Sequence, residues 1–282
     1  MDHISSKQKI EDFKKYLETS PRIILSAKFG DGKTTFLKEI TDESNEEFND
    51  YQFFTIYPVN YVVSKNEDIF EYIKRDILKQ LAEKNLLDDI DLNALVDSIF
   101  TFESLKEVIS FLLSFVLGGA VYNKLLNRFL KVKKTYDKKK TSYEKYEIKF
   151  ETQIGGLYEQ DAYTKMIKTA LEYMEKEHPE NKKKKSVLII EDLDRLDPDH
   201  LFRILNIISA HIDQTRYRDE NDNKFGFNNI VLVMDYDTTK HIFQHFYGAN
   251  ANYDGYMSKF FCKKPFYYSI KDGGDWYDPT TW

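Results

Sequence analysis

The sequence has little of what several protein classes depend on. Its single cysteine, Cys262, excludes an internal disulfide, and Met1 is followed by polar residues rather than by the apolar core of a signal peptide. The 41 basic and 47 acidic residues give a net charge of −6, so no overall positive field draws the chain to nucleic acid. We therefore expect the protein in the cytosol, without disulfides.

A long hydrophobic segment is missing as well. The best candidate for a membrane span, VISFLLSFVLGGAVY at 108–122, has 15 uncharged residues. As a helix this stretch reaches about 22 Å, against a bilayer core of about 30 Å. Residues 123–185 contain no second candidate that would return the chain to the same side. We expect a buried or partner-facing helix here, followed by a solvated basic run, and no membrane contact.

No stretch rich in proline, glycine and serine divides the chain into two halves. With 282 residues, 41% of them apolar, the chain can bury one sizeable core. We therefore expect a single domain over 1–282. Because no closing element is evident after the last expected strand, this domain is expected to be the N-terminal module of a longer protein or to be completed in an oligomer.

Strand-like and helix-like patterns alternate along most of the chain. Short apolar runs indicate strands, and apolar residues spaced three to four apart indicate helices. The expected strands are 22–26, 53–57, 186–190, 229–234 and 265–270. The expected helices are 6–19, 34–40, 66–81, 157–178, 201–212 and 238–246, with an irregular helical region over 84–150. This alternation predicts an α/β fold with a mainly parallel sheet of about five strands.

One stretch, SAKFGDGKTT at 26–35, joins the first expected strand to a helix and has the pattern of a phosphate-binding loop. Its glycines let successive N–H groups turn toward one point, and the following helix presents its positive end. The lysine supplies a charge for phosphate and the threonine a hydroxyl for Mg²⁺. The residues expected at the nucleotide are Ala27, Lys28, Phe29, Gly30, Asp31, Gly32, Lys33, Thr34 and Thr35.

Ala27 stands where this motif usually has its first glycine. A methyl group obstructs the loop only if the position requires a positive φ or a close backbone approach. The position directly follows a strand, where a negative φ is ordinary. We therefore expect the loop to bind nucleotide despite this substitution; the alternative is a glycine-rich turn without a ligand.

An acidic cluster, EDLDRLDPD, follows the apolar run SVLII. In phosphate-loop enzymes one carboxylate at such a strand end orders the Mg²⁺ shell, and a neighbouring one polarises the attacking water. Strand position favours Glu191 for the metal and Asp192 as the base, whereas the preference of Mg²⁺ for aspartate favours the reverse. Adjacent strand residues point to opposite faces, so the sequence leaves both assignments open.

Further polar residues are expected near the mouth of this site. Asp194 and Arg195 follow the carboxylate pair, and Arg195 is expected to pair with Asp194 or Glu191 or to complete the site of an adjacent subunit. Asp197, followed by a proline, suits the start of a helix. Asp235 follows the fourth expected strand, where it is either a sensor of the γ-phosphate or a helix cap.

These segments together resemble the KAP family of P-loop NTPases. SAKFGDGKTTFL is similar to the phosphate loop of that family, its Walker A motif, and IIEDLDRLDPDHLFRILNII is similar to its D-[DE]-L-D-R strand end, the Walker B motif. TIYPVNYVVSKNEDIFEYI, FNNIVLVMDYDTTKHIF and YMSKFFCKKPF resemble further segments of the family. The resemblance covers about residues 5–85 and 155–270.

The resemblance implies a three-layer sheet of the additional-strand, catalytic-glutamate type, with a helical insertion at 84–150 between the two motifs. It also implies Mg²⁺-ATP binding and slow or regulated hydrolysis used as a conformational or assembly switch. Lys33 and Thr34 would serve phosphate and metal, Glu191 and Asp192 metal and water, and Asp194 and Arg195 the signature. Bacterial relatives frequently occur in antiviral defence, joined to an effector.

Two other functions stay open at this point. One is a nucleotide-gated interaction module with little or no hydrolysis, whose partner surface is the helical region 84–150. The other is a DNA-associated ATPase, which rests on the lysine-rich runs at 131–140 and 182–185. An effector protein or a second copy of the chain is the expected partner.

Overall fold

A computed structural model gives the fold of the chain. It describes residues 4–61, 69–87, 102–115, 162–176, 183–210, 223, 225–260 and 264–270, together with 127, 130, 131 and 134. The chain forms two compact units. The sheet unit comprises Met1–Phe70, His178–Asn223 and Phe227–Trp282, and the helical unit comprises Glu71–Glu177 and Lys224–Gly226.

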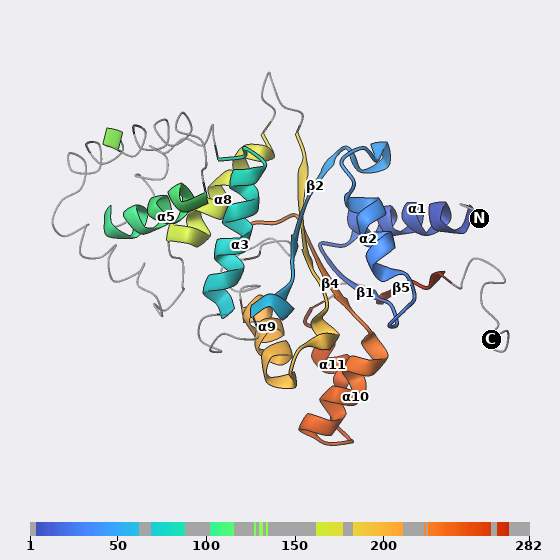
Figure 1. Ribbon diagram of the computed structural model, residues 1–282. Helices are drawn as coiled ribbons and strands as arrows, with labels where there is room; N and C mark the ends of the chain where they lie inside the picture. The colour runs from blue at the N-terminus through green and yellow to red at the C-terminus, as the bar shows by residue number, and fades with distance from the viewer. Residues whose placement is uncertain are drawn as a thin grey trace. The chain divides into compact units, whose positions relative to one another are not determined.

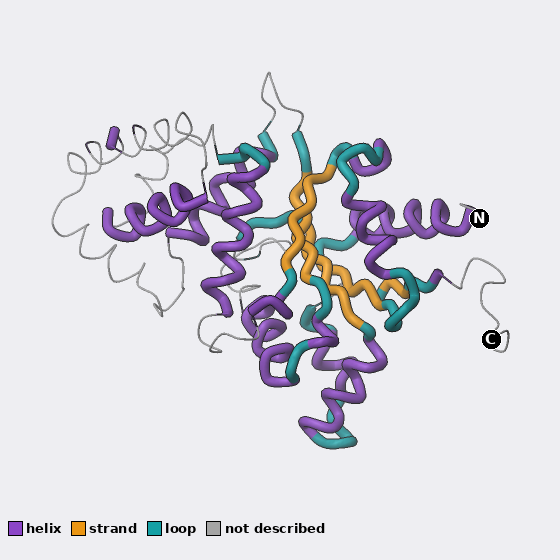
Figure 2. The backbone as a smooth tube through the Cα atoms, in the orientation of Figure 1, coloured by secondary structure: helices purple, strands orange, loops and turns teal. Residues whose placement is uncertain are grey.

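The sheet unit is built around five parallel strands (Figures 1 and 2). They are β1 (Arg22–Ser26), β2 (Tyr51–Ile56), β3 (Lys185–Ile190), β4 (Asn229–Met234) and β5 (Phe266–Tyr267). The spatial order is β2-β3-β4-β1-β5, so β4 lies between β1 and β3. The α/β class and the parallel sheet predicted from the sequence are confirmed.

The expected strand 265–270 was too long, since β5 contains two residues. The chain leaves the sheet just after β5, as the hydrogen bonds of the following amides show. The Tyr268 N–H still donates to the Ser26 carbonyl at 2.8 Å, but the Ile270 N–H donates to the Asp31 carbonyl at 3.1 Å. Residues 268–270 thus follow the loop after β1 instead of extending the strand.

The helices of the sheet unit agree closely with the sequence pattern. They are α1 (Ile4–Thr19), α2 (Lys33–Thr41), α9 (Pro198–Ala210), α10 (Tyr236–Tyr247) and α11 (Tyr253–Met257), with three-residue or four-residue 3₁₀ turns η1 (Glu46–Phe48), η2 (Pro58–Tyr61) and η3 (Leu193–Arg195). Pro198 opens α9, a position where its missing N–H has no intrahelical partner to lose. The sequence did not indicate α11 or the three turns.

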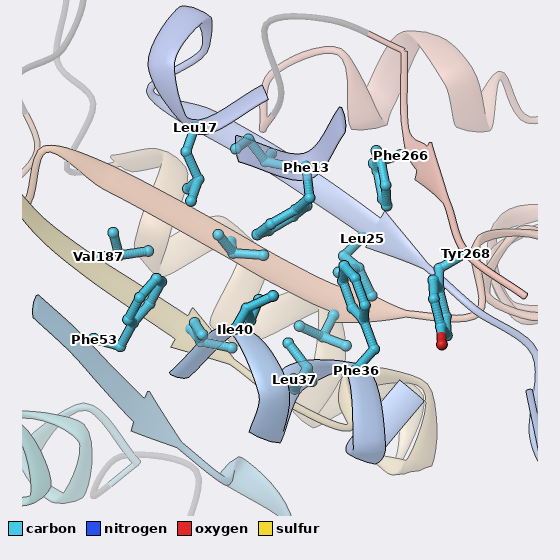
Figure 3. Close-up of a cluster of buried hydrophobic side chains, with 14 of the residues drawn as sticks. Phe13, Leu17, Leu25, Phe36, Leu37, Ile40, Phe53, Val187, Phe266 and Tyr268 are labelled. Carbon is cyan, nitrogen blue, oxygen red and sulfur yellow. The ribbon is translucent and has the colours of Figure 1, made fainter. Parts of the chain in front are cut away.

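A hydrophobic core holds α1 and α2 against one face of the sheet (Figure 3). Phe13 of α1 and Phe36 of α2 meet edge to face with their ring centroids 5.6 Å apart, and both rings also contact Phe266 of β5. Alternate residues of β1, β3 and β4 point into the same cluster. Strand β1 and helix α2, which flank the loop after β1, are therefore fixed by packing. Burial of each large side chain contributes about 2 kcal/mol to the stability of the fold.

The helical unit contains α3 (Ile69–Glu83, which begins in the sheet unit), α5 (Phe102–Phe115) and α8 (Ala162–Met174). Lys74 of α3 is only 2% exposed, and its ammonium pairs with Glu71 one turn earlier. The Arg75 guanidinium lies over the rings of Phe111 and Tyr163, 5.6 and 5.8 Å from their centroids. These contacts join the three helices through cations and aromatic rings.

The expected helical region 84–150 is described in part. Residues 102–115 form α5, while most of the rest, including 116–122 of the apolar stretch, lies outside the described residues. Within the part of the chain that the structure describes, no helix combines the length and the apolar character needed to cross a bilayer. That 84–150 is an insertion into a single domain stays a prediction.

Candidate functional site

The loop between β1 and α2 is a tight turn with two left-handed glycines. Gly30 has a φ of 83° and Gly32 a φ of 78°, conformations that glycine adopts without steric cost. The Asp31 N–H closes the turn onto the Lys28 carbonyl at 3.1 Å. An added Cβ at Gly30 would meet no atom within 4 Å. The backbone beside Gly30 is therefore open, next to the amino end of α2.

Ala27 causes no strain in this loop. It is 3% exposed and belongs to the core cluster, and its N–H donates to the Met234 carbonyl at 3.2 Å. Asn85 and Asp192 are the non-glycine residues with positive φ in the described part, so Ala27 keeps an ordinary backbone conformation, as its position after a strand predicts. The methyl group packs into the core instead of obstructing the loop.

The remaining loop residues differ in exposure. Phe29 is 96% exposed, and Lys28, Thr34 and Thr35 are also exposed, whereas Asp31 is buried. Thr34 and Thr35 lie in the first turn of α2, beside the open backbone of the loop. Their hydroxyls are therefore accessible to a ligand at this helix end, and their proposed contacts with nucleotide and metal stay predictions.

The acidic turn after β3, residues 191–195, faces this loop across β4. The Lys33 ammonium lies 3.1 Å from Oδ1 of Asp192 and 3.7 Å from Oδ1 of Asp194. All three side chains are largely buried, so this pairing is weakly screened. The fold thus brings together two motifs that lie about 160 positions apart in the sequence.

Asp192 has an unusual backbone conformation, and its carboxylate pairs with two cationic side chains. Its φ of 55° and ψ of 34° are left-handed, which costs a non-glycine residue about 1–2 kcal/mol. While Oδ1 faces Lys33, Oδ2 accepts a hydrogen bond from the exposed Arg195 guanidinium at 2.9 Å. Arg195 therefore pairs with Asp192, whereas the sequence predicted Asp194 or Glu191, because the left-handed turn at Asp192 brings its carboxylate within reach of the guanidinium.

Oδ1 of Asp194 is buried without a hydrogen-bond partner. Its described counter-charge is Lys33 at 3.7 Å, which is beyond hydrogen-bonding distance. A buried carboxylate oxygen in this state has unused capacity to accept a hydrogen bond or to bind a cation. Carboxylate oxygens of this kind are ligands that suit Mg²⁺.

Glu191 has a different environment from its neighbour. It is 4% exposed, and its N–H donates to the Ile56 carbonyl at 3.0 Å, which places it beside Tyr57 at the ends of β2 and β3. Burial raises the pKa of Glu191, the neighbouring Tyr57 hydroxyl opposes this shift, and the Asp192 charge raises the pKa further. Burial and the Glu191 charge in turn raise the pKa of Tyr57 to about 12.

Tyr57 was not among the residues that the sequence predicted for the site. It follows β2 directly, and β2 pairs with β3 so that Ile56 lies opposite Ile190. Tyr57 and Glu191 are therefore neighbours at the carboxyl edge of the sheet. Pairing β2 with β3 at sequence level would have revealed this contact, but strand order cannot be read from apolar runs alone.

Asp235 acts as a helix cap. Its side chain accepts hydrogen bonds from the N–H groups of Asp237 and Thr238 at 3.1 and 3.2 Å and from the Thr238 hydroxyl at 2.7 Å. These bonds satisfy free amides in the first turn of α10, which therefore begins before the predicted Thr238. The alternative role as a γ-phosphate sensor stays a prediction.

A parallel sheet, a glycine loop that opens a helix and an acidic turn facing the loop lysine define the class of P-loop nucleotide-binding domains. Comparison with protein families identifies the particular family. The model of the KAP family P-loop domain matches residues 7–267, and the chain belongs to this family. A search of curated proteins gave no significant match.

Proposed function

We propose that this protein binds ATP with Mg²⁺ and hydrolyses it, using the cycle as a conformational or assembly switch. The observation that carries the proposal is the position of Lys33, whose ammonium lies at the amino end of α2 between Asp192 and Asp194. In a phosphate loop this lysine binds the phosphates. The two carboxylates therefore hold the cation where a phosphate oxygen would take it over.

The residues of the loop fit a polyphosphate. The amides around Gly30 and Gly32 and the Lys33 ammonium would hold the phosphates, and Thr34, Asp192 and Asp194 would hold the metal. When bound, Mg²⁺ would neutralise charge that develops during phosphoryl transfer. The unpartnered Oδ1 of Asp194 supports this donor set, because a cation or its water would satisfy it.

The orientations of the Asp192 and Glu191 side chains support one of the two assignments that the sequence left open. Asp192 points to Lys33 and so to the phosphate side, which favours Asp192 for the metal shell. Glu191 is buried beside Tyr57, which favours Glu191 as the base that receives the proton of the attacking water. The position of β4 between β1 and β3 supports the additional-strand, catalytic-glutamate type.

ATP turnover by Lys33→Ala tests this proposal. Without the ammonium we expect turnover and ATP affinity to fall by a factor on the order of 100, because one charged phosphate contact is lost in a partly buried site. Lys38→Ala, which removes an exposed lysine of the same helix, is the matched control and should behave as wild type. Equal turnover in wild type and Lys33→Ala would refute the catalytic claim, and tight ATP binding without turnover would indicate an interaction module.

The biological setting rests on the family alone. We propose an effector protein or a second copy of the chain as the partner of the switch, with a role in bacterial antiviral defence in the cytosol. Measuring oligomer size with and without ATP addresses the first part. Expression of the protein in bacteria challenged with phage, with Lys33→Ala as the inactive control, addresses the second.

A further inference from the structure

We infer that Ile270 forms the base-binding subsite of this protein: its side chain, held against the phosphate loop, packs on the flat apolar face of the nucleotide's base. The inference deepens the proposed function and rests on it. The sequence patterns predicted residues for the phosphates and the metal but none for the base, and position 270 entered them only as the end of an expected strand.

Ile270 lies directly against the phosphate loop. Its N–H donates to the Asp31 carbonyl at 3.1 Å, and a Cβ added at Gly32 would lie 3.3 Å from Cδ1 and 3.4 Å from Cβ of Ile270. Gly32 is the N-cap of α2, and the amides of this turn are those that would bind phosphate oxygens. An apolar side chain therefore lies next to the proposed phosphate position.

Packing fixes the segment that carries Ile270. The Tyr268 ring stacks on Phe36 of α2 (Figure 3), with the ring centroids 4.3 Å apart, and the Tyr268 N–H donates to the Ser26 carbonyl at 2.8 Å. Tyr268 is buried, whereas Ile270 is 49% exposed. A side chain that is already held in place and still has open apolar surface gains from being covered and loses little conformational entropy.

The order of the strands places Ile270 on the side where a bound nucleotide would carry its base. Lys33 pairs with Asp192 and Asp194 of the acidic turn after β3, so in the proposed site the terminal phosphate and the metal lie on the β3 side of the loop. In the order β2-β3-β4-β1-β5, β5 lies on the opposite side of β1. The nucleoside end of the nucleotide therefore extends toward β5 and the residues that follow it.

Phe29 is the competing candidate, because it is the exposed large apolar side chain of the phosphate loop itself. It is 96% exposed, so neighbouring groups hardly constrain its ring. A base that stacks on Phe29 would have to fix this side chain at the cost of its conformational entropy. Ile270 needs no such ordering, because its contact with the loop already holds it. Ile270 is therefore the better platform for the base.

The first test measures the Kd of ATP and of ribose 5′-triphosphate, which lacks only the base, by calorimetric titration in the presence of Mg²⁺. Wild type is compared with Ile270→Ala and with Phe246→Ala as the control, since Phe246 at the far end of α10 has the same exposed fraction of 49%. We expect Ile270→Ala to raise the Kd for ATP roughly five-fold to tenfold and to leave the Kd for ribose 5′-triphosphate within about two-fold. Phe246→Ala should match wild type for both ligands.

Two results of this titration would contradict the inference. An equal loss of affinity for both ligands would mean that Ile270 only supports the phosphate loop. An unchanged Kd for ATP would mean that the base does not contact Ile270. Either result overturns the assignment of the base subsite.

The second test locates the base directly in the wild-type protein. 8-Azidoadenosine 5′-triphosphate carries a photoreactive group on its base, and irradiation followed by tryptic digestion identifies the labelled peptide. Trypsin separates the two candidates, because Phe29 falls in the peptide 29–33 and Ile270 in the peptide 264–271. We expect label on 264–271 that excess ATP suppresses. A peptide 264–271 free of label would overturn the inference, wherever else the label lies.

The two tests separate failure of the inference from failure of the proposed function. If wild type binds neither ATP nor ribose 5′-triphosphate and Lys33→Ala makes no difference, the proposed function fails. If wild type binds both ligands and Lys33→Ala weakens both, while Ile270→Ala equals wild type, the inference alone fails. A selective loss of ATP affinity in Ile270→Ala, together with label on 264–271, supports both.

Discussion

The phosphate loop after β1 and the acidic turn after β3 meet at Lys33, but they differ in backbone strain and in the burial of charged side chains. The loop places glycines at its left-handed positions and keeps Ala27 relaxed in the core. The acidic turn places Asp192 in a left-handed conformation and buries Glu191 beside it. The loop backbone is therefore relaxed, whereas the acidic turn combines a strained backbone at Asp192 with a buried carboxylate at Glu191.

Because of this difference, we expect the loop to serve nucleotide binding and the acidic turn to serve conformational change. A shared core fixes the loop between β1 and α2, so its conformation should change little when a nucleotide binds. Asp192 bridges Lys33 and Arg195, and in the proposed cycle a phosphate at Lys33 would compete with Asp192 for the ammonium. We therefore expect nucleotide-dependent change at 191–195 and a nearly unchanged loop.

The largest expected effect concerns the function of the acidic turn. Glu191→Gln keeps the size of the side chain but removes the proposed base. Turnover should fall by a factor on the order of 100 or more, with ATP affinity within about two-fold of wild type. Steady-state kinetics and equilibrium binding measure the two quantities, with the exposed Glu46→Gln as control. A parallel fall in affinity would contradict the assignment.

The next effect concerns the loop. Gly32→Ala and Gly30→Ala both place a side chain at positive φ, which costs about 1 kcal/mol or more. At Gly32 the new Cβ would also lie 3.3 Å from Cδ1 of Ile270, whereas at Gly30 it meets open space. We expect about 2 kcal/mol of destabilisation for Gly32→Ala and about 1 kcal/mol for Gly30→Ala by urea unfolding. The reverse order would show that residues 268–270 do not constrain the loop.

Sequence patterns predicted the parts of this comparison that depend on local physics. The apolar run at 229–234 coincides with β4, and the glycine loop lies between a strand and a helix as expected. The choice between Glu191 and Asp192 depends on which side chain faces Lys33, and that depends on the left-handed turn at Asp192. Neither this turn nor the β2–β3 pairing that brings Tyr57 to Glu191 has a sequence signal of its own.

The smallest effect concerns pH and stability in the acidic turn. Burial raises the pKa of Glu191 above its ordinary value of 4.5, so its contribution to stability is fully present below pH 4.5 and is lost as the pH rises through the folded-state value. Glu191→Gln avoids this loss. Its Tm, measured calorimetrically without nucleotide, should exceed that of wild type by roughly 2 °C at pH 7, and the difference should vanish toward pH 4.5.

Asp254 provides the control of opposite sign. Hydrogen bonds from Lys240 and Tyr236 hold its pKa below the ordinary value of 3.8, so its contribution is present above pH 3.8 and is lost as the pH falls through the folded-state value. Asp254→Asn should therefore lower the Tm at pH 7, with the difference shrinking in acid. A common sign for the two variants would mean that Glu191 is not strained by burial.

The central claim is that Asp192 holds Lys33 in place of a phosphate and turns to the metal when nucleotide binds. It is tested most directly by calorimetric titration of ATP into wild type and Asp192→Asn, with Mg²⁺ and with chelator. We expect a reversal: Asp192→Asn should bind ATP more tightly than wild type in chelator, because Lys33 is released, and more weakly with Mg²⁺, because a proposed metal ligand is lost. A change of the same sign in both conditions, or no change in either, would contradict it.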